Sequence, residues 1–150
     1  MSRRAGTRSN GLCRLGFAAG VAVALGCVMG GCRTGADPSL AGPAYPDDKA
    51  QGQTLDIQVV RTDTRISLTN TTARSFGPSR LWMNRWYSRA IDGLGVGQTL
   101  ELSLWDFRDE NGEMFRAGGF FATRRPDRLV QAQIETDGQV LGLVVVKGEE

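Results

Sequence analysis

The pattern of apolar and polar residues predicts short β-strands from about Thr54 to the end of the chain. Within short segments, apolar side chains recur at every second position, which places them on one face of a strand. No segment combines the apolar spacing of an α-helix with helix-capping residues. The seven predicted strands are 55–59, 66–68, 80–87, 100–104, 120–123, 129–135 and 140–146.

The residues between these segments support an all-β fold. Asp137-Gly138 separates the last two strands and is a strong signal for a two-residue β-hairpin turn. The strand 140–146 is apolar on both faces, which predicts a central position in a sheet. About seven strands joined by turns predict a single antiparallel β-sandwich over residues 54–147, followed by a tail at 148–150.

Parts of the predicted domain resemble the immunoglobulin-like and fibronectin-III-like accessory domains of bacterial surface proteins. The resemblance is carried by residues 66–72 (ISLTNTT) and 94–102 (LGVGQTLEL). In those domains an apolar strand often ends in Asn-Thr or Asn-Ser, and a Leu-x-Pro-Gly-Glu/Gln-Thr turn leads into the next strand. Val96 stands here in place of the proline. The resemblance implies an immunoglobulin-like sandwich and identifies no ligand.

The N-terminal residues are typical of a secretory signal peptide, which is basic first and then apolar. Four arginines come before the apolar run 15–31, and no acidic residue comes before Asp37. We therefore expect residues 1–31 to be a signal peptide. The alternative is a permanent membrane anchor, although 17 residues with five glycines are short for a span that needs about 20 strongly apolar residues.

The sequence Val28-Met29-Gly30-Gly31-Cys32 resembles the lipobox of bacterial lipoproteins, in which an apolar residue and two small residues precede a cysteine. The resemblance implies cleavage before Cys32 and attachment of a diacylglycerol to its sulfur, with Cys27 as a second candidate. The acyl chains would anchor the protein to a membrane. Because Arg33 and not aspartate follows Cys32, the resemblance also implies placement in the outer membrane, facing the periplasm.

Residues 32–53 are predicted to be the lipidated N-terminus and a flexible linker. This stretch contains Pro38, Pro43 and Pro46 among small and polar residues, and it has no periodicity. Such a spacer would hold the β domain away from the lipid surface.

Composition excludes several classes of chemistry. The chain has no histidine, and its three cysteines lie at positions 13, 27 and 32. The predicted domain therefore lacks the groups of Ser–His–Asp and Cys–His catalysis and of common zinc sites, and no cofactor is expected. From Cys32 onward, 14 basic and 16 acidic residues give a net charge of −2, which argues against nucleic-acid binding. Two-carboxylate glycoside hydrolysis and oxygen-ligated calcium or magnesium stay open.

A candidate binding strip lies on the predicted strand 80–87. Because successive side chains of a strand point to opposite faces, one face of this strand must belong to the core. Sandwich domains commonly bury a tryptophan on this strand, which favours Trp82 in the core. Burial of Leu81 and Met83 instead would leave two tryptophans exposed. The strip, a candidate for binding a sugar or a protein, consists of Trp82, Asn84, Trp86 and Tyr87.

Acidic residues around Gly112 suggest a cation site or a pair of catalytic carboxylates. Phe107 occupies a position where the EF-hand spacing requires an acidic or amide side chain. Glu110-Asn111-Gly112 is typical of a hairpin turn. We therefore favour a solvated turn, with Arg108 and Arg116 paired to the acids. The cluster consists of Asp106, Asp109, Glu110, Asn111 and Glu113.

A basic loop at residues 124–128 (RRPDR) precedes the predicted strand at 129. One interpretation is contact with phosphates of lipopolysaccharide or with acidic groups of peptidoglycan. We favour a solvated loop whose charge is offset by Asp127, because exposed charges specify little by themselves.

The sequence as a whole predicts a non-enzymatic lipoprotein of the bacterial envelope, anchored through Cys32, with one sandwich as an interaction or structural module. The alternative is a carbohydrate-binding or carboxylate-dependent envelope enzyme centred on Trp82, Trp86 and the acids at 106–113. A third hypothesis is a subunit that adds an edge strand to a larger envelope complex. The expected partners are the membrane, through the lipid, and an envelope protein or glycan; no nucleic acid is expected.

Overall fold

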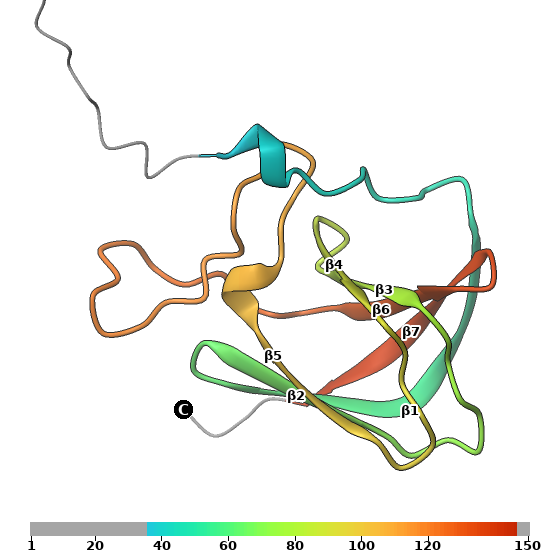
Figure 1. Ribbon diagram of the computed structural model, residues 1–150. Helices are drawn as coiled ribbons and strands as arrows, with labels where there is room; N and C mark the ends of the chain where they lie inside the picture. Colours follow the sequence, from blue (N-terminus) through green and yellow to red (C-terminus); the bar gives the residue numbers. More distant parts are fainter. Residues whose placement is uncertain (1–35, 147–150) are drawn as a thin grey trace, which may run out of the picture. The chain divides into compact units, whose positions relative to one another are not determined.

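A computed structural model describes residues 36–146, which form seven β-strands and two short 3-10 helices (Figure 1). The predicted signal peptide, Cys27, Cys32 and the predicted tail lie outside the described residues. The strands are β1 (Ala50–Thr62), β2 (Arg65–Asn70), β3 (Ser79–Met83), β4 (Tyr87–Ile91), β5 (Thr99–Ser103), β6 (Ala132–Thr136) and β7 (Gln139–Val146). The helices are η1 (Pro38–Leu40) and η2 (Leu104–Asp106).

All seven strands belong to one curled sheet with the order β4-β3-β6-β7-β1-β2-β5 (Figure 1). Neighbouring strands are antiparallel except β1 and β7, which pair in parallel. The all-β prediction is confirmed, but the fold is a single mixed sheet and not the predicted antiparallel immunoglobulin-like sandwich. The long strand β1 helps to explain the difference. Its pairing with β7 shifts register on both sides of Thr54, and such irregularities bend a sheet without dividing it into two layers.

One face of the curled sheet forms the hydrophobic core. Alternate residues of the strands point into it, such as Ile57 and Val59 of β1, which are fully buried. Phe107 and Phe115, from the segment between β5 and β6, are also fully buried in this core. Burial of each such side chain contributes about 1.5–3 kcal/mol to folding. The alternation in the sequence therefore identifies the inner face of β1 correctly.

The predicted strand 80–87 is in fact a β-hairpin. β3 ends at Met83 and β4 begins at Tyr87, because Asn84 and Arg85 adopt left-handed backbone conformations with φ values of 54° and 61°. Two consecutive residues of this kind form a turn whose twist suits an antiparallel hairpin. The turn was difficult to predict because arginine occupies a position where glycine is typical.

Two further sequence predictions have opposite outcomes. The Asp137-Gly138 turn joins β6 to β7 as predicted, with φ values of 48° and 77°, and β7 is the central strand. Residues 120–123, in contrast, form part of an exposed loop and not a strand. Phe120 and Phe121 are 95% and 90% exposed, so the apolar character of this segment does not reflect burial.

Residues 36–49 lie against the sheet domain, where composition predicted a flexible linker, and β1 begins at Ala50 rather than at Thr54. The backbone amide of Asp37 donates a hydrogen bond to the Gly112 carbonyl oxygen at 3.3 Å. The two backbones are so close that a Cβ added to Gly112, whose φ is +80°, would lie 1.9 Å from the Asp37 carbonyl oxygen. This segment therefore contributes directly to the surface of the domain.

Candidate functional site

A surface hollow lies between the β3–β4 turn and the segment that leads into β1. Its volume is about 380 Å³. Trp86 is 56% exposed at this hollow, and its indole offers both an apolar ring and a hydrogen-bond donor to a ligand. We call this feature the Trp86 hollow; it is lined by Pro43, Ala44, Tyr45, Asp47, Arg85, Trp86 and Glu110.

The side chain of Asn84 holds the β3–β4 turn in place. Its oxygen accepts hydrogen bonds from the backbone amides of Val130 at 2.9 Å and Gln131 at 3.2 Å. Its amide nitrogen donates to the carbonyl oxygen of Arg128 at 2.7 Å. Asparagine also tolerates the left-handed conformation better than most residues. Asn84 therefore has a structural role: it fixes the turn that carries Trp86.

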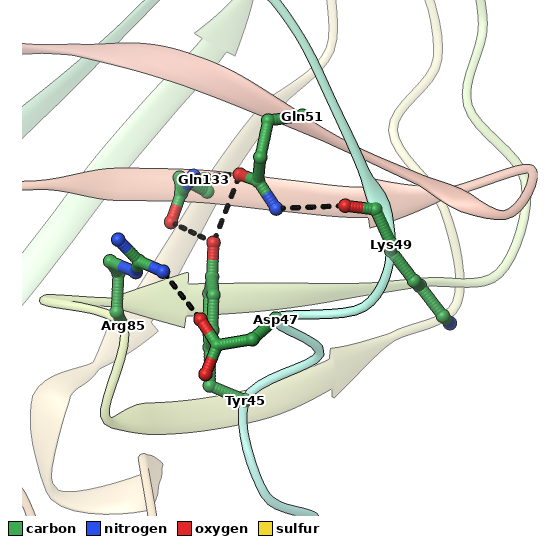
Figure 2. A network of polar contacts seen from close by, with 6 residues as sticks. All are labelled: Tyr45, Asp47, Lys49, Gln51, Arg85 and Gln133. Atoms are coloured by element: carbon green, nitrogen blue, oxygen red, sulfur yellow. Dashed lines mark hydrogen bonds and ion pairs between the residues drawn. The ribbon is translucent and has the colours of Figure 1, made fainter.

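The guanidinium of Arg85 is held between an aromatic ring and a carboxylate. Its Cζ lies 4.7 Å from the centroid of the Tyr45 ring, and a terminal nitrogen donates to Oδ1 of Asp47 at 2.5 Å (Figure 2). Each of these interactions is weak at an exposed site, but together they restrict the side chain. The hollow consequently presents a positioned cation next to the exposed indole of Trp86.

Tyr45 connects the hollow to the side chains beneath it. Its hydroxyl lies 3.0 Å from Oε1 of Gln133 and 3.1 Å from Oε1 of Gln51, and it donates to one of these oxygens at a time (Figure 2). Its ring contacts Trp82 edge to face, with the ring centroids 5.2 Å apart. The Tyr45 side of the hollow is therefore supported by the buried side chains of Trp82 and Gln133.

Trp82 is buried on the face of the sheet opposite to the main core. Its neighbours Leu81 and Met83 belong to the core cluster, so the Trp82 indole points to the other side of β3. The indole is nevertheless only 1% exposed, because Tyr45 packs on it and its Nε1 donates to Glu135 at 2.8 Å. The predicted burial of Trp82 is confirmed. The core cluster nevertheless lies on the Leu81 and Met83 side of β3, and not on the tryptophan side that the sequence favoured.

Glu135 joins β6 to the segment that precedes β1. Its carboxylate accepts the hydrogen bond from Trp82 and forms an ion pair with Lys49. Burial by itself raises the pKa of this carboxyl, but the hydrogen bonds from Lys49 and Trp82 outweigh burial and hold the pKa of Glu135 below its ordinary value of 4.5. The ionised carboxylate of Glu135 therefore helps to fix the indole of Trp82, on which Tyr45 packs.

Tyr87 follows Trp86 in sequence but does not line the hollow. Its ring contacts Phe115 edge to face with the centroids 5.2 Å apart, and its hydroxyl lies 3.3 Å from the Asp127 carboxylate. Burial, together with the nearby charge of Asp127, raises the pKa of Tyr87 to about 12. Of the four residues in the predicted strip, only Trp86 lines the hollow.

The acidic cluster forms a turn, as predicted, but its Asp109 is buried and not solvated. Oδ1 of the buried Asp109 accepts hydrogen bonds from the backbone amides of Asn111 at 2.9 Å and Glu113 at 2.7 Å. Arg116, expected to pair with these acids, instead pairs with Asp127 at 2.8 Å. Among residues 36–146, no group of three or more histidine, cysteine, aspartate or glutamate side chains could hold a metal ion.

Comparison with known protein families, curated proteins and solved structures finds no match for this chain. No helix in the described part of the chain is both long enough and apolar enough to cross a membrane. The chemistry of the Trp86 hollow and the sequence around Cys32 are therefore the basis for proposing a function.

Sequence reasoning identified Trp86 but missed three residues that surround it. Tyr45 and Asp47 lie in the stretch predicted as a linker, and Arg85 lies in the turn that divides the predicted strand 80–87. One signal was present: Tyr45 is the only aromatic residue between positions 33 and 53. A buried aromatic ring of this kind contributes much apolar contact area, and its hydroxyl can find a hydrogen-bond partner in the folded domain.

Proposed function

We propose that this chain is a lipid-anchored protein of the bacterial envelope, attached through Cys32, and that its β domain is a non-catalytic interaction module. The observation that carries the interaction role is the exposed indole of Trp86 beside the positioned guanidinium of Arg85. Tryptophan and arginine are the residue types most enriched where a few side chains supply most of the binding energy. Because Arg85 is already held by Tyr45 and Asp47, little further ordering is needed on binding.

The proposed anchor rests on the lipobox-like sequence that ends at Cys32. Labelling of the full chain with a fatty-acid analogue tests it, with Cys32→Ala and Cys27→Ala for comparison. We expect label in the parent and in Cys27→Ala, and none in Cys32→Ala. Label that is retained in Cys32→Ala and lost in Cys27→Ala would move the attachment site. Absence of label from the parent would refute the lipid anchor.

The interaction role is tested with Trp86→Ala in the anchored protein. A partner that copurifies with the parent in a fixed ratio should be lost from Trp86→Ala, because truncation of a central tryptophan costs about 2 kcal/mol or more of binding energy. The matched control is Trp105→Ala, since Trp105 is 39% exposed on η2 and does not line the hollow. Equal retention of the partner by both variants would contradict binding at the Trp86 hollow.

Carbohydrate binding is a second candidate function, favoured by the polar groups of Asp47, Arg85 and Glu110 around the exposed indole. Ligand sites commonly combine an aromatic surface with a few polar groups that fix orientation. Titration with soluble peptidoglycan fragments, followed by tryptophan fluorescence, would give a saturable change in the parent and in Trp105→Ala but not in Trp86→Ala. A carboxylate-dependent enzyme stays a prediction from the sequence; release of reducing sugar ends from peptidoglycan would be its readout.

A further inference from the structure

A loop between η2 and β6 exposes two aromatic side chains to solvent. Phe120 and Phe121 are 95% and 90% exposed, and their rings contact each other edge to face with the centroids 5.0 Å apart. Exposed apolar side chains that are clustered indicate a surface that binds something. We call residues 118–128 the aromatic loop; it lies in the orange segment that extends away from the sheet in Figure 1.

The base of the aromatic loop is fixed, although its tip is exposed. Arg116 and Asp127 face each other across the base, with an ion pair at 2.8 Å and a backbone hydrogen bond at 2.8 Å. Arg61 reaches the base from β1 and donates to the carbonyl oxygens of Ala117 at 2.7 Å and Asp127 at 2.5 Å. The two phenylalanines are therefore presented on a firmly supported loop.

Two arginines lie close in sequence to the two phenylalanines of the loop. Arg124 and Arg125 are exposed on the same loop, and no acidic residue lies between Glu113 and Asp127. The Asp127 carboxylate is already paired with Arg116 at the base. An apolar tip followed by cations matches the layers of an anionic bilayer, in which phosphate groups lie above the acyl chains. This charge complementarity favours an anionic bilayer over a neutral surface as the partner of the loop tip.

We propose that the aromatic loop is a membrane-contact site that inserts Phe120 and Phe121 into the interface of an anionic phospholipid bilayer. The guanidinium groups of Arg124 and Arg125 bind the phosphate groups at the level of the lipid headgroups. This contact is additional to the proposed anchor and does not require acylation of Cys32. An anchor would strengthen it by keeping the loop at a high local concentration near the membrane.

Fluorescence quenching by lipid tests the insertion. Phe121→Trp, made in the full chain, is mixed with vesicles of phosphatidylglycerol and phosphatidylethanolamine whose acyl chains carry bromine. The parent, with its three native tryptophans, gives the background to subtract. The matched control is Val96→Trp, because Val96 is 58% exposed in the connection between β4 and β5. We expect severalfold stronger quenching of the added tryptophan at 121 than at 96; equal quenching, or none at 121, would overturn the proposal.

Charge dependence identifies the lipid surface. Adding Arg124→Gln and Arg125→Gln to the Phe121→Trp chain should reduce the quenching severalfold at low salt, and replacing phosphatidylglycerol with phosphatidylcholine should have the same effect. Undiminished quenching after both changes would contradict binding to anionic headgroups. A blue-shifted emission of Phe121→Trp without vesicles would show that a second copy, or residues outside 36–146, covers the tip, and this would also overturn the proposal.

The same measurement in Cys32→Ala separates the loop from the anchor. Quenching in a chain that has lost its fatty-acid label supports the membrane contact by the loop alone. A chain that keeps its label but shows no quenching at position 121 refutes the loop contact and leaves the anchor supported.

Discussion

The β3–β4 turn and the aromatic loop both combine arginine with aromatic residues, but the two segments are stabilised differently. In the turn, Arg85 packs on Tyr45 and pairs with Asp47, so its guanidinium belongs to a network within the chain (Figure 2). In the aromatic loop, Phe120 and Phe121 contact each other and are almost fully exposed. The difference lies in the neighbouring segment, which supplies partners to the turn. Composition alone does not distinguish basic and aromatic side chains that a neighbouring segment holds in position from aromatic side chains that contact only each other.

The largest expected loss of stability comes from replacing Trp82, the buried tryptophan on which Tyr45 packs. Trp82→Ala should lower the free energy of unfolding by about 3–5 kcal/mol, because it removes a buried indole and leaves a cavity under Tyr45. Urea unfolding monitored by circular dichroism measures this loss. Trp86→Ala is the control and should stay within about 0.5 kcal/mol of the parent, since its side chain is mostly exposed. Similar losses in both variants would show that Trp86 also belongs to the framework.

The turn itself depends on Asn84. Asn84→Ala should lower the free energy of unfolding by about 2 kcal/mol, because it removes the hydrogen bonds to residues 128–131. It also puts alanine, which tolerates the left-handed conformation less well than asparagine, at a φ of 54°. Asn84→Gly removes the same hydrogen bonds but tolerates the backbone conformation, so it should cost about 1 kcal/mol. The two values are measured by urea unfolding. If the alanine and glycine variants were equally destabilised, the left-handed backbone conformation would contribute nothing to the cost of replacing Asn84.

A smaller effect is expected from the charge on Glu135. The folded-state pKa of Glu135 lies below the ordinary value of 4.5, so its contribution to stability is fully present above that value and is lost as the pH falls through the lower folded pKa. Glu135→Gln should therefore lose less stability than the parent when the pH is lowered through this range. Thermal unfolding midpoints at neutral and acidic pH measure the difference. An identical acid response in both proteins would assign the effect to other carboxylates.

The smallest effect is expected at the tip of the aromatic loop. The double variant Phe120→Ala/Phe121→Ala should unfold within about 0.5 kcal/mol of the parent, because both rings are exposed and contact each other. Urea unfolding in the absence of lipid gives this comparison. A loss of several kcal/mol would mean that the rings pack within the chain, and the contrast with the β3–β4 turn would then disappear.

Residue alternation identified the strands that bury one face, but it did not identify their partners. Ile57 and Val59 are followed by a turn and by Ile66 and Leu68, so local spacing was enough to predict β1 and β2. The parallel pairing of β1 with β7 joins residues far apart in sequence, and nothing in the local pattern encodes it. Periodicity alone therefore could not predict that the strands form a single mixed sheet.

The candidate site was predicted only in part, for two physical reasons. Trp86 was a candidate because alternation placed it with Trp82 on a face that is exposed if Leu81 and Met83 are buried, whereas in the structure it belongs to the turn before β4. The Asn84-Arg85 turn was missed because its left-handed conformation is maintained by hydrogen bonds to residues 128–131, and no glycine signals it. Tyr45 was missed because a stretch rich in proline and small residues has the composition of a linker, whereas the stretch is held by hydrogen bonds, ion pairs and the contact of Tyr45 with Trp82.

Among the strands of residues 36–146, the parallel neighbours β1 and β7 are also the first and the last to be synthesised. Ala50–Thr62 is synthesised early, but it cannot pair with its neighbour in the middle of the sheet until Gln139–Val146 has also been synthesised. Contacts between such distant parts of a chain form slowly, because a long loop must be closed first. Premature termination before Gln139 would remove the central strand and leave β1 and β6 without their shared neighbour.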